Sequence, residues 1–180
     1  MMLYHGSPTE GLTRLLPAAS ALADTKEQLV YLTSLPTAAL FYGVRCFEYA
    51  YGYNWKDGIP GGLHYIECFP DALRILYSGR AGFLYCCEAE GLAATQKPNE
   101  YVSLQPVDIT GCTEIPDLYE AFLKAEREGE LEIFRYETLS PKMLLHIEQT
   151  AAQIVKEQNL YQADTPFASY MREHYPKAFL

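Results

Sequence analysis

The chain lacks the sequence signals of secreted and membrane-spanning proteins. Residues 1–5 contain neither a basic region nor an apolar one, so we expect no signal peptide. No apolar run reaches the roughly 18 residues that a transmembrane helix needs, so we predict no membrane partner. Cysteine is scarce, and the five cysteines are an odd number with no Cys-x-x-Cys spacing. These absences predict a cytoplasmic protein with reduced, mostly buried thiols.

Several common catalytic motifs are also missing. The sequence has no Gly-x-Gly-x-x-Gly dinucleotide loop, no phosphate-binding loop, no Gly-x-Ser-x-Gly nucleophile elbow and no His-Glu-x-x-His zinc helix. His146 and His174 lie in predicted helices without a second ligand at helical spacing, so we predict no metal site. The pair Glu88 and Glu90 could suggest a glycosidase, but in a chain with 23 acidic residues such a pair arises by chance.

The composition is that of one folded domain with an acidic surplus. The 180 residues are 49% hydrophobic and 21% charged, which excludes a disordered chain and allows a single core. We predict one domain over 1–180, with a core over about 1–139 and a helical extension over about 140–180. The net charge of −9 disfavours nucleic acid as a partner. The 15 tyrosines are the unusual feature, since tyrosine suits half-buried surfaces and ligand walls alike.

Short strands and helices alternate through the first two-thirds of the chain, and helices dominate the end. Runs of β-branched and aromatic residues predict strands at 3–5, 29–33, 63–69, 82–88, 100–104 and 130–136. Start and stop signals predict helices at 37–50, 71–76, 116–129, 140–159 and for two turns from 165, with a loop and short helix within 17–26. Turn-forming residues predict an exposed excursion at 52–62. This order favours an α+β domain over a doubly wound sheet.

The first predicted strand ends at a histidine beside a flexible backbone. His5 is followed by Gly6 and Ser7, and a glycine lets the backbone approach a ligand closely. A histidine in this place can bind a ligand, or it can simply cap the end of a strand. The sequence alone leaves both interpretations open for His5.

Two tyrosines and a glutamate follow at suggestive positions. Tyr31 lies in the second predicted strand, and Tyr42 follows 11 residues later on the predicted helix. Two such rings can face each other across a cleft and hold a planar aromatic ligand, although each can also be an ordinary core residue. Glu100 begins a strand, where its carboxylate can stand at a sheet edge or simply face solvent.

These residues belong to four short segments of the chain: Tyr4-His5-Gly6-Ser7, Val30-Tyr31-Leu32-Thr33, Tyr42 and Asn99-Glu100-Tyr101-Val102. In order and spacing they resemble the ADP-ribosyltransferases of the His-Tyr-Glu class, which includes diphtheria toxin and the poly(ADP-ribose) polymerases. The resemblance covers about residues 3–105. It implies a split, strongly bent antiparallel β-sheet that holds NAD⁺ in a central cleft, with flanking helices and the helical extension beside it.

The resemblance also implies a role for each residue toward NAD⁺. His5 would hydrogen-bond the adenosine ribose, and the Gly6 backbone would pair with the nicotinamide carboxamide. Tyr31 and Tyr42 would enclose the nicotinamide ring. Glu100 would bind the 2′-hydroxyl of the nicotinamide ribose as the glycosidic bond breaks. On this view Glu100, His5 and Tyr31 are the catalytic set.

One position departs from the polymerase branch of the family. Three residues before Tyr42 those enzymes have a serine that bonds the carboxamide, whereas this chain has Ala39. One lost hydrogen bond weakens nicotinamide binding by about 1 kcal/mol. Ser7, which we place in the NAD⁺ site, or the Gly6 backbone can compensate.

The function that follows is a mono-ADP-ribosyltransferase acting on an unknown acceptor, with a protein or small molecule favoured over nucleic acid. A catalytically inactive module that binds NAD⁺ or a protein is one alternative. An RNA 2′-phosphotransferase is another, but it needs histidine and arginine where this chain has Tyr31 and Glu100. Glu88 is the reserve candidate for the catalytic acid. The oligomeric state stays open.

An aromatic stretch with period-two spacing is the candidate acceptor surface, and a lid over the core or a dimer contact is the other interpretation. Its members are Phe47, Tyr49, Tyr51, Tyr53 and Trp55.

Overall fold

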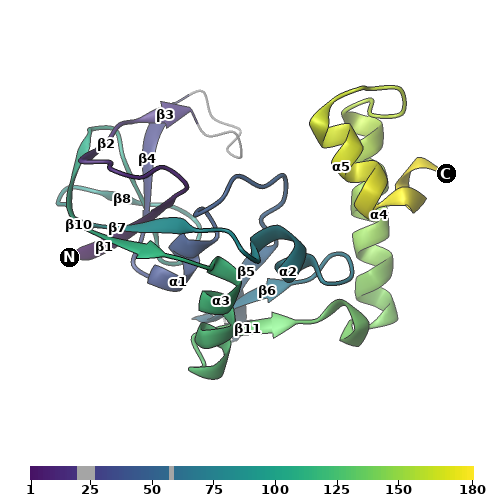
Figure 1. Ribbon diagram of the computed structural model, residues 1–180, viewed down its shortest axis with the longest axis horizontal. Helices are drawn as coiled ribbons and strands as arrows, with labels where there is room; N and C mark the ends of the chain where they lie inside the picture. The colour runs from purple at the N-terminus through teal and green to yellow at the C-terminus, as the bar shows by residue number, and fades with distance from the viewer. Residues whose placement is uncertain (20–26, 57–58) are drawn as a thin grey trace.

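The computed structural model describes residues 1–19, 27–56 and 59–180, which form two β-sheets and five α-helices (Figure 1). The larger sheet contains β1 (Met2–Ser7), β2 (Arg14–Leu15), β3 (Ala18–Ala19), β4 (Gln28–Thr33), β7 (Gly82–Glu88), β8 (Ala93–Ala94), β9 (Glu100–Ser103) and β10 (Val107–Ile115). The smaller sheet contains β5 (Tyr51–Lys56), β6 (Ile59–Ile66) and β11 (Leu131–Phe134). The helices are α1 (Pro36–Leu40), α2 (Ala72–Tyr77), α3 (Leu118–Arg127), α4 (Pro141–Glu157) and α5 (Pro166–His174), with 3₁₀ turns η1 (Tyr136–Thr138) and η2 (Pro176–Phe179).

The α+β class is confirmed, and the larger sheet is antiparallel throughout its described strands. Its order is β2-β10-β7-β1-β4-β9-β8, with β3 paired to β4. The smaller sheet, β11-β6-β5, departs from the predicted antiparallel core because β11 pairs parallel to β6. A long connection through α2, β7–β10 and α3 separates these two strands, and parallel pairing requires such a crossover.

Figure 1 shows the molecule as three parts in a row. The larger sheet lies at one end, the smaller sheet with α2 and α3 lies in the middle, and α4 with α5 stands at the other end. Each part has a cluster of buried apolar side chains. The middle cluster is the largest and is rich in aromatic rings, including Phe41, Tyr65, Tyr77 and Phe122.

The first strand is longer than the sequence predicted. Its ladder with β7 continues through Gly6, opposite Leu84, and Ser7, opposite Phe83. The glycine does not break the strand but lets helix α1 pack directly onto it, because a Cβ on Gly6 would lie 1.8 Å from the Ala39 carbonyl oxygen.

The helix predicted over 37–50 is wrong beyond Leu40. The Tyr42 and Gly43 amides donate to carbonyls three residues back, a tighter spacing than that of the α-helix, and the chain then leaves the helix. Phe41 is fully buried and stacks on Phe122 at 4.4 Å and on Tyr51 at 4.8 Å. The packing of Phe41 therefore sets the end of α1, although the apolar spacing of the sequence predicted a longer helix.

The described part of the excursion predicted at 52–62 consists of strands, in which residues 52–54 are half-buried and 61–62 are exposed. Strands β5 and β6 form an antiparallel hairpin there, with Tyr51 opposite Tyr65 and Tyr53 opposite Leu63. The side chains of residues 55–60, Trp55 among them, lie outside the described part of the structure. The short helix expected within 17–26 falls on residues 20–26, which also lie outside it, whereas 18–19 form β3. Strand β10 was not predicted.

The helices after residue 115 follow their start signals. Asp117 caps α3, Ser140 caps α4 and Thr165 caps α5, each side chain accepting a hydrogen bond from the backbone amide three residues on. Asn159, in the left-handed conformation at φ 52°, follows α4 as predicted. The predicted helices at 140–159 and from 165 are therefore confirmed.

The five cysteines are all described and all are free thiols. Only Cys87 is buried, however, and Cys112 is exposed, so the prediction of mostly buried thiols is wrong. Within the described residues no helix is long and apolar enough to cross a membrane.

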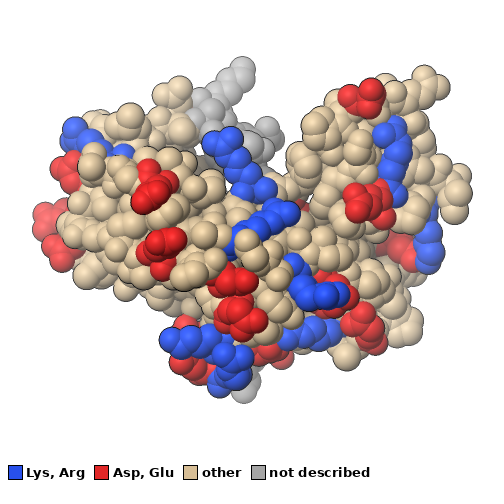
Figure 2. Space-filling view, in the orientation of Figure 1, with Lys and Arg blue, Asp and Glu red and all other residues tan. Residues whose placement is uncertain are grey.

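On the face drawn in Figure 2, basic side chains run in a broken column down the middle, with acidic ones on both sides. The acidic surplus therefore does not form one patch on this face.

Candidate functional site

Three adjacent strands bring the predicted site residues together. Strand β4 lies between β1 and β9, and Thr33 faces Tyr4 on one side and Glu100 on the other. His5 follows Tyr4 on β1, and its Nδ1 donates a hydrogen bond of 3.0 Å to the backbone carbonyl of Tyr31 on β4. The antiparallel register thus places residues from three distant segments side by side.

His5 is held as a neutral ring. A carbonyl oxygen only accepts hydrogen bonds, so the contact with Tyr31 requires the proton on Nδ1. Burial lowers the pKa of His5, and the hydrogen bond to Tyr31 opposes this effect only in part. The Nε2 atom therefore carries a free lone pair at neutral pH.

Helix α1 carries the chain from β4 back across β1. Pro36 occupies its first turn, and Ala38 and Ala39 are buried against the sheet. The Cα of Gly6 faces the Ala39 carbonyl, which excludes any side chain at that position. Ser7 is buried as well, and its hydroxyl oxygen accepts a hydrogen bond of 3.1 Å from the Thr9 amide. The Ser7 hydroxyl therefore already has one hydrogen-bond partner, in the turn that follows β1.

Tyr42 lies just beyond α1 in a cluster of tyrosines. Its ring stacks on Tyr49 with centroids 5.0 Å apart, and its hydroxyl hydrogen-bonds the Tyr51 hydroxyl at 2.8 Å. Burial is the main cause of its raised pKa; the bond to Tyr51 lowers it, and the charge of Glu100 raises it further. Among the described rings, Tyr42 makes no direct contact with Tyr31.

Glu100 is held at the start of β9 by a tight preceding turn. Asn99 adopts the left-handed conformation at φ 61°, and its carbonyl accepts a hydrogen bond of 3.0 Å from the Ser34 amide. The Thr95 hydroxyl donates to Glu100 Oε1 at 2.9 Å, and Lys97 Nζ lies 3.8 Å from Oε2. The Glu100 side chain is only 15% exposed. Its carboxylate is therefore fixed in position and paired.

A cleft of about 430 Å³ opens beside these residues. Its lining consists of Tyr42, Tyr49, Tyr51, Gly52, Tyr53, Gln96, Lys97 and Pro98. Of the predicted site residues only Tyr42 lines it, and Glu100 adjoins it through the ion pair with Lys97. Burial, with the Glu100 charge as a lesser cause, raises the pKa of Tyr53 to about 12, so the tyrosine walls stay uncharged.

The chain matches no family model, no curated protein and no solved structure. The candidate site is therefore interpreted from its own residues.

Sequence reasoning missed the segment that closes the cleft. Thr95, Gln96 and Lys97 precede Pro98-Asn99, and no motif marks them as site residues. The aromatic stretch singled out in the sequence contributes side chains to two different parts of the structure. Tyr49, Tyr51 and Tyr53 line the cleft, whereas Phe47 contacts the rings of α5.

Other candidate groups lie away from this cleft. Glu88 is exposed at the end of β7, opposite Met2. Within the described residues no cluster of three or more histidine, cysteine or acidic side chains could hold a metal ion.

Proposed function

We propose that this chain is an NAD⁺-dependent mono-ADP-ribosyltransferase, which breaks the bond between nicotinamide and ribose and transfers ADP-ribose to an acceptor. The observation that supports this most is the adjacency of β1, β4 and β9. It brings His5, Tyr31 and Glu100 together from segments far apart in sequence, next to Tyr42. This is the neighbourhood that the resemblance to the His-Tyr-Glu class requires.

Glu100 supplies the charge that the reaction needs. When the C1′–N bond breaks, its electron pair leaves with nicotinamide, which departs neutral, and the ribose becomes an oxocarbenium-like cation. A carboxylate fixed beforehand near that carbon stabilises positive charge that exists only near the transition state. Thr95 and Lys97 hold the Glu100 carboxylate in place, so little reorganisation is needed at the moment of reaction.

The remaining residues orient the substrate. Tyr31 and Tyr42 hold the nicotinamide ring by stacking, and the raised pKa of Tyr42 keeps its phenol neutral beside the positively charged pyridinium. His5 presents its free Nε2 as an acceptor for a ribose hydroxyl. Holding the substrate in one orientation removes an entropic part of the barrier.

The acceptor enters from the cleft lined by tyrosines. Rings at Tyr49 and Tyr53 suit an aromatic or apolar portion of a protein or small molecule. The net charge of −9 disfavours a nucleic-acid acceptor.

Two observations favour a second candidate, a module that binds NAD⁺ or a protein without catalysis. Ala39 removes one hydrogen bond to the carboxamide. Both Glu100 oxygens already have partners, in Thr95 and Lys97, and a substrate hydroxyl would have to compete with them.

The first test is release of free nicotinamide from NAD⁺, measured by chromatography, with Glu100→Gln as the matched variant. We expect the wild type to release nicotinamide and the variant to release it 10²–10³-fold more slowly, because one fixed electrostatic group is typically worth that factor. The melting temperature of the variant controls for folding.

Calorimetric titration with NAD⁺ separates the two candidates. NAD⁺ binding without nicotinamide release under any condition identifies the binding module. If NAD⁺ neither binds nor is cleaved, the transferase and the NAD⁺-binding module are both refuted, and of the two candidates only a protein-binding module is left.

A further inference from the structure

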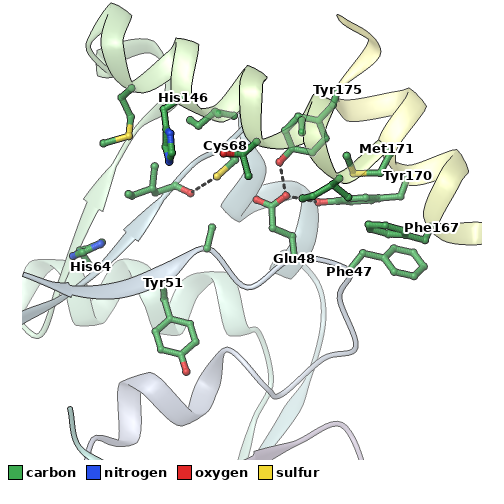
Figure 3. A pocket seen from close by; sticks show the side chains of 17 residues that line it. Phe47, Glu48, Tyr51, His64, Cys68, His146, Phe167, Tyr170, Met171 and Tyr175 are labelled. Carbon is green, nitrogen blue, oxygen red and sulfur yellow. Dashed lines mark hydrogen bonds between the residues drawn. The ribbon is translucent and has the colours of Figure 1, made fainter. Parts of the chain in front are cut away.

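A second cavity, of about 380 Å³, lies between the helical extension and the middle of the molecule (Figure 3). Its walls come from residues 47–51, β6, α4 and α5. Most of the lining is apolar or aromatic, and no lysine or arginine contributes to it. Tyr51 borders both cavities, but Figure 3 shows its ring pointing away from this one. The second cavity is therefore separate from the tyrosine-lined cleft.

One carboxylate faces this apolar space. The hydroxyls of Tyr170 and Tyr175 both donate to Glu48 Oε2, from α5 and from the residue after it. Figure 3 shows the carboxylate among these two rings and Cys68. The other oxygen, Oε1, is buried and has no hydrogen-bond partner within the described part of the chain.

No positive group of the described residues balances that carboxylate. Glu48 takes part in no ion pair there. Burial is the main cause of the raised pKa of the Cys68 thiol, which stays protonated and donates to the Ile66 carbonyl. Burial likewise lowers the pKa of His64, whose Nδ1 is buried without a partner on the same cavity wall.

A buried charge without a partner is costly, and charge-assisted hydrogen bonds are the strongest compensation for it. The aromatic rings around the carboxylate add to this, because their faces attract cations. Phe167 and Tyr170 stack on each other, and Phe47 contacts both, at the α5 side of the cavity.

We propose that this cavity binds an organic cation, an ammonium group carried on an apolar or aromatic body. The ammonium lies beside the Glu48 carboxylate, and the body packs among Ile147, Ile154 and the rings of α5. An anion of the same shape is repelled by the carboxylate, and a neutral ligand leaves the charge unbalanced. The site is independent of NAD⁺, so the proposed transferase activity does not bear on it.

The test uses three probes with one shape: 4-phenylbutylammonium, 4-phenylbutan-1-ol and 4-phenylbutyrate. Each is titrated calorimetrically into the full chain without NAD⁺. We expect the ammonium probe to bind at least tenfold more tightly than the alcohol, and the carboxylate not to bind. Equal affinity for ammonium and alcohol would overturn the proposal, as would binding of none of the three.

Variants connect the binding to the cavity. Glu48→Gln keeps the shape and removes the charge, and we expect it to weaken ammonium binding at least tenfold while leaving the alcohol unchanged. Thr150→Phe, at an exposed position of α4 on the cavity wall, should weaken both probes by narrowing the space, even if Glu48→Gln folds poorly. Glu126→Gln, which removes a carboxylate paired with Arg135 outside the cavity, is the matched control. Ammonium binding that survives both cavity variants would refute the assignment.

Discussion

At the scale of single residues, the tyrosines have several different roles. Tyr65, Tyr77 and Tyr85 are fully buried and act as core residues. The Tyr85 hydroxyl donates to the Thr9 carbonyl at 2.7 Å and accepts from the Leu12 amide at 3.2 Å, so this side chain anchors the loop after β1. Composition predicted that tyrosine matters here, but it cannot separate these roles, because burial of each ring depends on contacts between distant segments.

Gly6 gives the clearest prediction for one residue. Gly6→Ala places a methyl group 1.8 Å from the Ala39 carbonyl oxygen, so α1 must move away from β1. We expect a loss of stability of about 1–3 kcal/mol or more, the usual cost of overpacking, measured as the free energy of unfolding in urea. Under the proposed function NAD⁺ binding should fall as well, because α1 leads to Tyr42.

Gly111→Ala is the matched control for this change. Gly111 is also a strand glycine, in β10, but a Cβ there would meet only the Cys86 Cβ at an ordinary 3.7 Å. If both variants are equally stable, the close contact at Gly6 does not determine the packing of α1.

His5 predicts a pH dependence of stability. Its pKa is lowered in the folded state by burial, so below about pH 6.5 the unfolded chain binds more protons than the folded one. This part of the stability is therefore complete above pH 6.5 and is lost as the pH falls below it. His64, whose pKa is also lowered by burial, contributes with the same sign.

The measurement is urea unfolding between pH 5 and 8. We expect His5→Asn to flatten the fall in stability below pH 6.5, leaving the His64 part. An unchanged slope in His5→Asn would show that His5 is not buried as a neutral ring.

At the scale of elements, the sequence predicted a helix or strand correctly where neighbouring residues alone determine that element. The caps at Ser140 and Thr165 and the proline after each one marked α4 and α5 correctly. Strands β1, β4, β7 and β9 were also found, because each is a short β-branched or aromatic run. Helix α1 was overextended and β10 was missed, since the burial of Phe41 and the irregular pairing between Ile109 and Gly111 are set by other elements.

The caps can be tested through α4. Ser140 Oγ accepts a hydrogen bond of 3.2 Å from the Met143 amide, so Ser140→Ala should cost about 1 kcal/mol of unfolding free energy. Ser140→Asp should retain the wild-type stability because aspartate caps equally well. A loss that is the same in both variants would attribute the effect to something other than the cap. The unfolding free energies of the variants are compared through their denaturant midpoints, provided that the dependence of the free energy on denaturant concentration is the same.

The candidate site was predictable from sequence only as a set of residues. His5, Tyr31, Tyr42 and Glu100 were chosen by resemblance, and the strand order that places them together is not encoded in any one segment. Thr95 and Lys97, which hold Glu100, carry no motif and become visible only once the turn before β9 is formed.

At the scale of the whole molecule, Glu67 joins three elements. It is 4% exposed and follows β6; its Oε1 accepts from the Leu73 amide in α2 and its Oε2 from the Tyr136 amide in η1. Through η1 it connects the middle of the molecule to the start of the helical extension. No sequence pattern singles out this residue among 23 acidic ones.

Removing Glu67 should therefore be strongly destabilising. Glu67→Ala leaves two amides without an acceptor, each at a cost of about 1–3 kcal/mol if it stays buried. Glu67→Gln keeps one acceptor oxygen and should fall between the alanine variant and the wild type. For a chain of this length each kcal/mol lowers the melting temperature by about 2–4 °C, so calorimetry resolves the series. A glutamine variant as unstable as alanine would contradict this ranking.

The position of β1 in the larger sheet has a consequence for biosynthesis. This strand lies between β4 and β7, and Met2 pairs with Glu88. At about 5–20 residues per second, the ribosome needs several seconds to deliver β7 after β1 has been made. During that interval β1 has an open edge, which can pair with another nascent chain. Strand β1 thus waits for β7, so the yield of folded protein should rise when the chain is produced at lower temperature or with more chaperone.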